Sequence, residues 1–368
     1  MSLTRREFLA RSFFGVAGLF ALLNGQQKNS KILKEALFYD RLSKSRTRCR
    51  ICFRGCLLRD GERSFCRNRI NLDGRLYSLV YGRPSAIQID PIEKEPVYHF
   101  LPGSKIYCIG TAGCNFRCKF CQNWHLSQRS IDEMSVVFDL DPGLAIEDAT
   151  KRGIKTISFT YNEPTSCYEY LYDTAKVAKN HDLRVIFHSN GSMNEEPLKE
   201  LLQYTDAVVI DLKGFTKKFY QDVSGASLEP VLKTIATVKD QGVWLEIVNL
   251  LIPELNDDDA DLKRMAVWIR SNIGDDVPLH FSRFFPQYRL KQLLPTPIKT
   301  LEAAYEIGRS AGLKFISIGN VPGHKHNSTF CPSCNNKLIE RVHFTVLENK
   351  IEGGRCPFCK VAIPGIWS

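Results

Sequence analysis

Three closely spaced cysteines, Cys114, Cys118 and Cys121, have the chemistry and spacing of metal-cluster ligands. Cysteine thiolates are the usual protein ligands of iron–sulfur clusters. A four-iron cluster held by only three thiolates keeps one iron open to a further ligand, as a reactive cluster requires. A zinc loop or a ferredoxin-like carrier fits poorly, because no fourth cysteine lies nearby. The aromatic Phe120 precedes the last cysteine, and small residues that allow tight backbone wrapping precede the first, namely Gly110, Ala112 and Gly113.

Two further cysteine groups also have metal-type spacing. The first lies near the N-terminus and comprises Cys49, Cys52, Cys56 and Cys66. Four thiolates predict a closed site, for which zinc is the default ion and a second iron–sulfur cluster is the alternative. Its role, structural or facing a substrate, stays open. The second group forms two CxxC pairs and predicts a zinc ribbon, made of Cys331, Cys334, Cys356 and Cys359.

Composition limits the remaining possibilities. The chain has 368 residues, of which 43% are hydrophobic and 24% are charged, as expected for a globular protein of two or three domains. Its net charge is +10, but the basic residues are dispersed, so no nucleic-acid partner is expected. The clustering of most of the 13 cysteines favours metal sites over a disulfide framework. The two isolated cysteines, Cys108 and Cys167, are expected to be small buried apolar side chains.

The first 25 residues are expected to be a targeting segment. Thr4–Leu9 matches the twin-arginine export consensus, and the apolar run Ser12–Leu23 is too short for a membrane span. This segment predicts an exported, periplasmic protein, or one associated with the membrane through its N-terminus. No A-x-A cleavage site follows, so an anchoring helix with the enzyme on the cytoplasmic side remains an alternative.

From Lys105 onward, short apolar strands alternate with helical stretches. The pattern predicts an α/β fold with a parallel sheet, in the form of a partial (β/α) TIM-type barrel of about six units. The expected strands are 106–109, 156–160, 184–188, 207–212, 244–250, 278–282 and 314–318. The expected helices are 142–152, 168–181, 195–202, 228–241, 258–271 and 301–311.

Other elements complete the expected domain organisation. Residues 28–47 are expected to form a linker, and residues 76–81 and 86–89 a small antiparallel hairpin. The expected parts are a targeting segment (1–25), a cysteine-rich module with that hairpin (26–104), a barrel (105–323) and a zinc ribbon (324–368).

Polar residues follow successive predicted strands, where barrel enzymes place their sites. They are Asn162, Glu163, Ser189, Asn190, Asp211, Lys213 and Arg283. Asp211 and Lys213 could equally form a structural ion pair. His188 and His280 are more often core histidines with satisfied hydrogen bonds than ligands.

The three-cysteine stretch with its aromatic resembles the motif of the radical S-adenosylmethionine (SAM) enzymes. That resemblance implies a [4Fe-4S] cluster whose open iron binds SAM, and reductive cleavage of SAM to a 5′-deoxyadenosyl radical. Asn162 and Glu163 are then expected at the SAM amino group, and Ser189 and Asn190 at its ribose. Asp211 and Lys213 are expected near the methionine carboxylate or the ribose, and Arg283 near a carboxylate.

From about Cys49 to Trp367 the chain is similar to the AmmeMemoRadiSam system radical SAM proteins, relatives of the pyruvate formate-lyase activating enzyme. The residues that carry this resemblance are the N-terminal cysteines, 74–77, 90–94, 99–103, 118–124, 161–164, 211–213 and the closing ribbon with 363–367. Phe53 departs from the proline expected after the second cysteine. The resemblance implies an activating-enzyme-like oxidoreductase that removes hydrogen from a substrate.

The same kinship suggests a protein substrate and an electron donor such as ferredoxin or flavodoxin. Two other classes stay open. One is an iron–sulfur electron-transfer or assembly protein without SAM turnover. The other is a zinc-ribbon binding module with a vestigial barrel, against which the intact cysteines and Asn162 and Glu163 argue.

Overall fold

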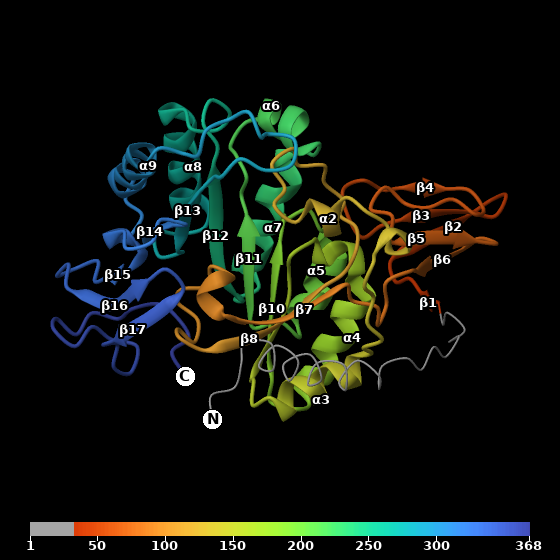
Figure 1. Ribbon diagram of the computed structural model, residues 1–368, viewed down its shortest axis with the longest axis horizontal. Helices are drawn as coiled ribbons and strands as arrows, with labels where there is room; N and C mark the ends of the chain where they lie inside the picture. The colour runs from red at the N-terminus through yellow and green to blue at the C-terminus, as the bar shows by residue number, and fades with distance from the viewer. Residues whose placement is uncertain (1–32) are drawn as a thin grey trace, which may run out of the picture. The chain divides into compact units, whose positions relative to one another are not determined.

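The computed structural model describes residues 33–368, and its centre is an eight-stranded sheet (Figure 1). The strand order is β14-β13-β12-β11-β10-β9-β8-β7, the reverse of the chain order without interruption. Strands β8 to β14 are parallel to one another, and β7 is antiparallel to β8. The strands are β7 Ala86–Pro91, β8 Lys105–Gly110, β9 Thr156–Phe159, β10 Arg184–Ser189, β11 Ala207–Asp211, β12 Trp244–Leu251, β13 Leu279–Arg283 and β14 Ile316–Gly319.

The strand interiors are mostly buried, as expected for parallel strands covered on both faces. All four residues of β9 are buried, as are the first four of β11. The structure confirms an α/β fold with a mainly parallel sheet, and each of the seven parallel strands expected from the sequence is present.

Helices connect the parallel strands and cover the sheet. They are α2 Trp124–Ser127, α3 Pro142–Lys151, α4 Tyr168–Lys179, α5 Glu195–Leu202, α6 Lys217–Phe219, α7 Leu228–Asp240, α8 Asp259–Asn272 and α9 Ile298–Ser310. Local capping fixes several starts: the Asp141 carboxylate accepts from the Leu144 amide, and Asp258 accepts from the Asp261 amide. Short 3₁₀ turns are η1 Ile92–Lys94, η2 Ile131–Glu133, η3 Pro164–Cys167 and η5 Lys325–Asn327, and Tyr220–Ser224 (η4) is a π-helix.

The segment before the large sheet forms two small sheets of three strands each, in the orders β1-β6-β5 and β2-β3-β4. These strands are β1 Lys34–Glu35, β2 Tyr39–Leu42, β3 Arg46–Cys49, β4 Leu57–Leu58, β5 Arg69–Leu72 and β6 Arg75–Ser78. The described part of the expected linker, 33–47, therefore contains β1, β2 and the start of β3.

The predicted hairpin between residues 76–81 and 86–89 is wrong. Strand β6 pairs with β5 and β1, whereas β7 pairs with β8 in the large sheet. Both stretches have an alternating pattern, but the pattern does not say which strand each will pair with.

The last segment forms a three-stranded antiparallel sheet from β15 Thr329–Phe330, β16 Lys337–Val342 and β17 Thr345–Asn349. Strands β16 and β17, which lie between the two CxxC pairs, thus form an antiparallel hairpin. Its core packs around Phe315, Leu338 and Ile339 together with two of the cysteines. The chain end returns to the segment that precedes β8, since the Ile366 amide donates to the His99 carbonyl at 2.8 Å.

No helix from residue 33 to the C-terminus is long and apolar enough to cross a membrane. The expected targeting segment, residues 1–25, lies outside the described residues.

Candidate active site

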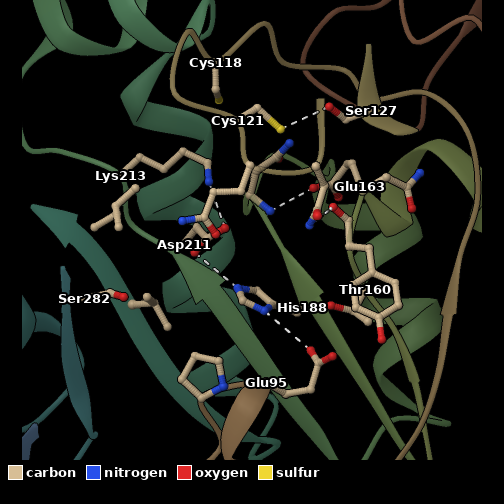
Figure 2. A pocket seen from close by; sticks show the side chains of 18 of the residues that line it. Glu95, Cys118, Cys121, Ser127, Thr160, Glu163, His188, Asp211, Lys213 and Ser282 are labelled. Atoms are coloured by element: carbon tan, nitrogen blue, oxygen red, sulfur yellow. Dashed lines mark hydrogen bonds and ion pairs between the residues drawn. The ribbon is translucent and has the colours of Figure 1, made fainter. Parts of the chain in front are cut away.

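A cavity of about 420 Å³ opens at the carboxyl ends of the sheet strands, and all three cysteines of the predicted cluster motif line it. Cys114 and Cys118 are buried and Cys121 is half-buried. The Cys121 thiol lies 3.1 Å from the Ser127 hydroxyl, and the two are drawn together in Figure 2. Burial raises the pKa of Cys118 to about 12, and it raises the pKa of Cys114 well above its usual value. Neutral, buried thiols facing one space are suited to become thiolates when a positively charged cluster binds.

The backbone before the first cysteine has no room for a side chain. Gly113 has a φ of +80°, and a Cβ there would lie 2.3 Å from the Cys66 carbonyl oxygen and 2.6 Å from Asn68 Oδ1. The loop that carries Cys114 is therefore pressed against the segment that carries Cys66. Asn68 Nδ2 also donates to the Ala112 carbonyl at 2.5 Å.

Asn162 holds the same loop from the other side. Its Nδ2 donates to the carbonyl oxygens of Ala112 at 3.1 Å and Gly113 at 2.8 Å, and its Oδ1 accepts from the Thr111 amide at 3.0 Å. Tyr161, with a φ of +70°, turns the chain at the end of β9 just before Asn162. The structure therefore places Asn162 beside the cluster loop, with its amide already engaged by the backbone.

Glu163, Ser189 and Asn190 form a buried hydrogen-bond network. Ser189 Oγ donates to Glu163 Oε1 at 2.8 Å, and the Asn190 amide donates to Glu163 Oε2 at 2.8 Å. Asn190 Nδ2 donates to Asn115 Oδ1 at 2.8 Å, next to the first cysteine. Burial raises the pKa of Glu163. The network joins the ends of β9 and β10 to the cysteine loop.

A row of charged side chains crosses the cavity (Figure 2). It begins at Lys213, on the side of the cysteines, and ends at Glu95, on the far side. Lys213 Nζ lies 2.8 Å from Asp211 and 5.6 Å from the centre of the Phe120 ring. His188 follows, with Nε2 at 3.2 Å from Asp211 and Nδ1 at 3.6 Å from Glu95. Although burial disfavours the imidazolium, the two carboxylates raise the pKa of His188 to about 10. Burial also opposes charge on Lys213, but Asp211 raises its pKa.

Sequence reasoning did not single out Glu95. Its side chain is 3% exposed, its Oε2 has no hydrogen-bond partner, and it lines the cavity. The only local signal was a carboxylate in a proline-flanked stretch. Its role becomes visible only when His188, on a distant strand, is placed beside it.

One expected residue, Arg283, lies elsewhere, whereas His280 lines the cavity with its ring nitrogens already engaged. Arg283 is not among the residues that line this cavity; its Nε donates to the Thr296 carbonyl at 2.8 Å. His280 is a core histidine, as expected, because its ring nitrogens lie 2.7 Å from Glu246 Oε2 and 2.6 Å from Ser317 Oγ. Cys108 and Cys167 are buried, also as expected.

The other two cysteine groups differ in spacing. Among the described residues, one group of at least three His, Cys, Asp or Glu side chains has all its ligand atoms within 4.8 Å of one another. It consists of Cys331, Cys334, Cys356 and Cys359. Cys49, Cys52, Cys56 and Cys66 instead line a separate small cavity.

Comparison with known proteins agrees with this geometry. Residues 108–266 match the model of the radical SAM superfamily. The chain is 43% identical to the uncharacterised protein MJ0808 of Methanocaldococcus jannaschii, over 89% of this chain and 98% of that protein. It is 28% identical to the pyruvate formate-lyase-activating enzyme of Staphylococcus epidermidis, over 46% of this chain and 70% of the enzyme.

A solved domain of a pyruvate-formate lyase-activating enzyme from Bacteroides vulgatus is 20% identical, with a TM-score of 0.40. The match covers 44% of this chain and 98% of that domain, and the likeness is too distant to inform the site.

The chain therefore belongs to the radical SAM superfamily and is an enzyme of the activating-enzyme type. The predicted export or membrane association is contradicted. No described helix could span a membrane, and the matched relatives bear the names of uncharacterised proteins and activating enzymes, none of which indicates export. The twin-arginine resemblance of a few residues was too short a pattern to carry that prediction.

Proposed function

We propose that this enzyme binds a [4Fe-4S] cluster through Cys114, Cys118 and Cys121 and cleaves SAM reductively, so that hydrogen is removed from a substrate. The observation that carries the proposal is that all three thiols open into one cavity with the Asp211–Lys213 pair. When bound, the cluster and SAM together supply a 5′-deoxyadenosyl radical. The cavity volume of about 420 Å³ lies in the range of small-molecule cofactor sites.

The residues of the chain have distinct roles in this proposal. Lys213 and Asp211 offer a buried cation and anion near Cys118, suited to the carboxylate and ammonium ends of an amino acid. Asn162, Glu163, Ser189 and Asn190 position the cysteine loop and the strand ends, since their polar atoms are engaged with one another and with backbone. Phe120 packs 6.1 Å from Phe219, between ring centres, and helps to exclude water from the cysteines.

The proposed architecture is a partial barrel. The uninterrupted strand order supports it, because each strand neighbours the next one in the chain. Successive helices also contact one another, α3 with α4, α5 with α7 and α8 with α9, as in a single outer layer. The parts proposed from the sequence, 26–104, 105–323 and 324–368, correspond to the small sheets with β7, the main parallel sheet and the last sheet.

We also propose that the C-terminal cysteines hold zinc. The Cys331 and Cys359 sulfurs are 3.5 Å apart, and those of Cys334 and Cys356 are 3.7 Å apart. Zn–S bonds of about 2.3 Å place tetrahedral thiolates roughly 3.8 Å apart, which matches this spacing. An ion with four thiolates has no open position, so the role is structural or in docking a partner.

The proposed substrate is a protein, and the proposed reductant is a ferredoxin or flavodoxin. The similarity to activating enzymes supports both. Recovery of a protein partner by the anaerobic, SAM-loaded enzyme, with hydrogen transfer from that partner into 5′-deoxyadenosine, tests the substrate class. Efficient turnover of a small metabolite with no protein partner would contradict it.

The experiment for the reaction itself is anaerobic. The protein is reconstituted with iron and sulfide, mixed with SAM and a strong reductant, and 5′-deoxyadenosine is quantified by mass spectrometry. We expect product from the wild type and from Cys167→Ala, a buried cysteine outside the cavity, and none above background from Cys118→Ala. A wild-type protein that carries the cluster but forms no 5′-deoxyadenosine would favour an electron carrier instead.

A further inference from the structure

We propose that Cys49, Cys52, Cys56 and Cys66 hold a second iron–sulfur cluster, which delivers electrons to the cluster at Cys114, Cys118 and Cys121. The four residues come from β3, from the turn after it and from the start of the β5 segment, and they line one cavity together with Arg69 and Asn115. Four thiols that face one space are typical of ligands to a metal centre.

An unsatisfied guanidinium N–H indicates that the group bound by these thiols supplies a hydrogen-bond acceptor. Arg69 is 1% exposed and lines the cavity, and its Nη1 lies 2.7 Å from Glu169. Its Nη2 has no hydrogen-bond partner. A buried guanidinium N–H without a partner is costly, so an acceptor is expected in the cavity. Thiolates bound to a metal centre are such acceptors.

The spacing of the thiols favours a cluster over zinc. The ribbon cysteines have their sulfurs within 4.8 Å of one another, as ligands of one ion must. No three of the N-terminal cysteines meet that limit in the described structure, and neither do the three cysteines of the radical SAM motif. Thiolates that each bind a different iron of a cube stand farther apart than thiolates that share one ion. Both of these cysteine groups therefore differ from the ribbon, whose sulfurs are close enough to share one ion.

The position of the site indicates its role. Asn115, the residue after Cys114, forms part of the wall of the N-terminal cavity. Arg54, also in that wall, donates from Nε to the Asn115 carbonyl at 2.6 Å. The Cys66 carbonyl oxygen lies where a Cβ on Gly113 would be. The two cysteine sites are thus adjacent, since consecutive residues Cys114 and Asn115 line one site each, and this adjacency suits electron transfer between them.

The proposed step moves one electron and changes no bond. A low-potential one-electron donor protein reduces the N-terminal cluster, which is then oxidised by one electron as the cluster at Cys114 is reduced by one. This step rests on the proposed function, whereas the identity of the N-terminal cluster does not.

Metal content and spectroscopy of the full chain test the cluster. In a Cys114→Ala, Cys118→Ala, Cys121→Ala triple variant we expect about four irons and four sulfides per chain, with a paramagnetic signal after reduction that SAM does not alter. In the Cys52→Ala, Cys56→Ala double variant we expect about four irons per chain and a paramagnetic signal that SAM does alter. The wild type, which needs no folding control, should hold about eight irons.

The outcomes separate the two proposals. Zinc in place of iron in the triple variant, or only about four irons in the wild type, overturns the second cluster. If the triple variant binds iron and the Cys52→Ala, Cys56→Ala double variant binds none, the proposed function is overturned and the second cluster is supported.

The electron route has its own test. With reduced ferredoxin as donor, Cys52→Ala, Cys56→Ala should slow reduction of the remaining cluster, followed by rapid-freeze paramagnetic resonance, by at least about tenfold. With dithionite, which can reach that cluster directly, the rate should be within about twofold of the wild type. Equal slowing with both donors would show structural damage, and no slowing with either would overturn the relay.

Discussion

At the scale of residues, the site divides into side chains that hold the loop and side chains left with charge facing the cavity. Asn162 and Glu163 use their polar atoms on neighbouring backbone and hydroxyl groups. His188, Lys213 and Asp211 instead form a row of ion pairs along the cavity. The first set is expected to govern how well the cluster is held, and the second to govern what binds beside it.

The charge on His188 should appear in the pH dependence of stability. Its pKa rises from 6.5 to about 10 on folding, so its contribution is complete below about pH 6.5 and is lost as the pH rises through 10. At low pH the contribution is on the order of a few kcal/mol, since one pKa unit is about 1.4 kcal/mol. Urea unfolding of the wild type and His188→Gln should therefore differ most near pH 6 and converge near pH 10. A constant difference would contradict the assignment.

Removing the Asn162 amide should loosen the cysteine loop. Asn162→Ala breaks bonds to Thr111, Ala112 and Gly113, and we expect a loss of about 2–4 kcal/mol in the free energy of unfolding. Iron bound after reconstitution should fall with it. The exposed Asn272, which bonds only within its own helix, provides a control: Asn272→Ala should change stability by less than about 0.5 kcal/mol. Equal effects of both substitutions would show that Asn162 does not brace the loop.

At the scale of elements, the position of the cysteine loop depends on contact between two segments far apart in sequence. The loop after β8 packs against the Cys66–Asn68 segment, with Gly113 at the contact. Strand β7, antiparallel at the edge of the sheet, precedes the turn that carries Glu95 into the cavity. These contacts bring the small sheets and the large sheet to one site.

Gly113→Ala should be far more damaging than a glycine substitution in open space. The new Cβ would lie 2.3 Å from the Cys66 carbonyl oxygen, and alanine would also be strained at a φ of +80°. We therefore expect a loss of roughly 3–5 kcal/mol in the free energy of unfolding. Gly153 has a similar φ of +68° with nothing within 4 Å, so Gly153→Ala should lose only about 1 kcal/mol. Unfolding in urea gives both values. If the two variants lose the same, the close packing at Gly113 does not matter.

At the scale of the whole described unit, one buried arginine joins the last sheet to the segment between β7 and β8. Arg341 of β16 donates from Nη2 to the Tyr98 carbonyl at 2.6 Å, and its Nε lies 3.6 Å from Glu93. Both charged side chains are fully buried. Residues from 34 to 368 accordingly pack as one unit.

Breaking this pair on one side should be costly. Arg341→Met leaves the Glu93 carboxylate buried without its cation, and we expect a loss of about 3–5 kcal/mol in a thermal or urea unfolding experiment. Adding Glu93→Gln removes the uncompensated charge and should recover part of that loss. A double variant no more stable than Arg341→Met would mean that lost packing, rather than the buried charge, causes the damage.

The sequence by itself determined the three cysteine groups, the alternation of strand and helix, and the superfamily. These features are local: ligand spacing and hydrophobic periodicity are visible within short windows. The expected strands 156–160 and 184–188, for example, agree with β9 and β10 to within one residue.

Only the tertiary structure decided where the polar side chains point. The Asn190 amide donates a hydrogen bond to the Glu163 carboxylate. Arg283 lies away from the cavity, and Glu95 reaches His188 from another part of the chain. The pairing of β7 with β8 was likewise decided only by the fold, because the sequence had predicted a hairpin of 76–81 with 86–89 instead. The physical reason is that a hydrogen bond depends on direction and on a partner distant in sequence, and residue type and spacing specify neither.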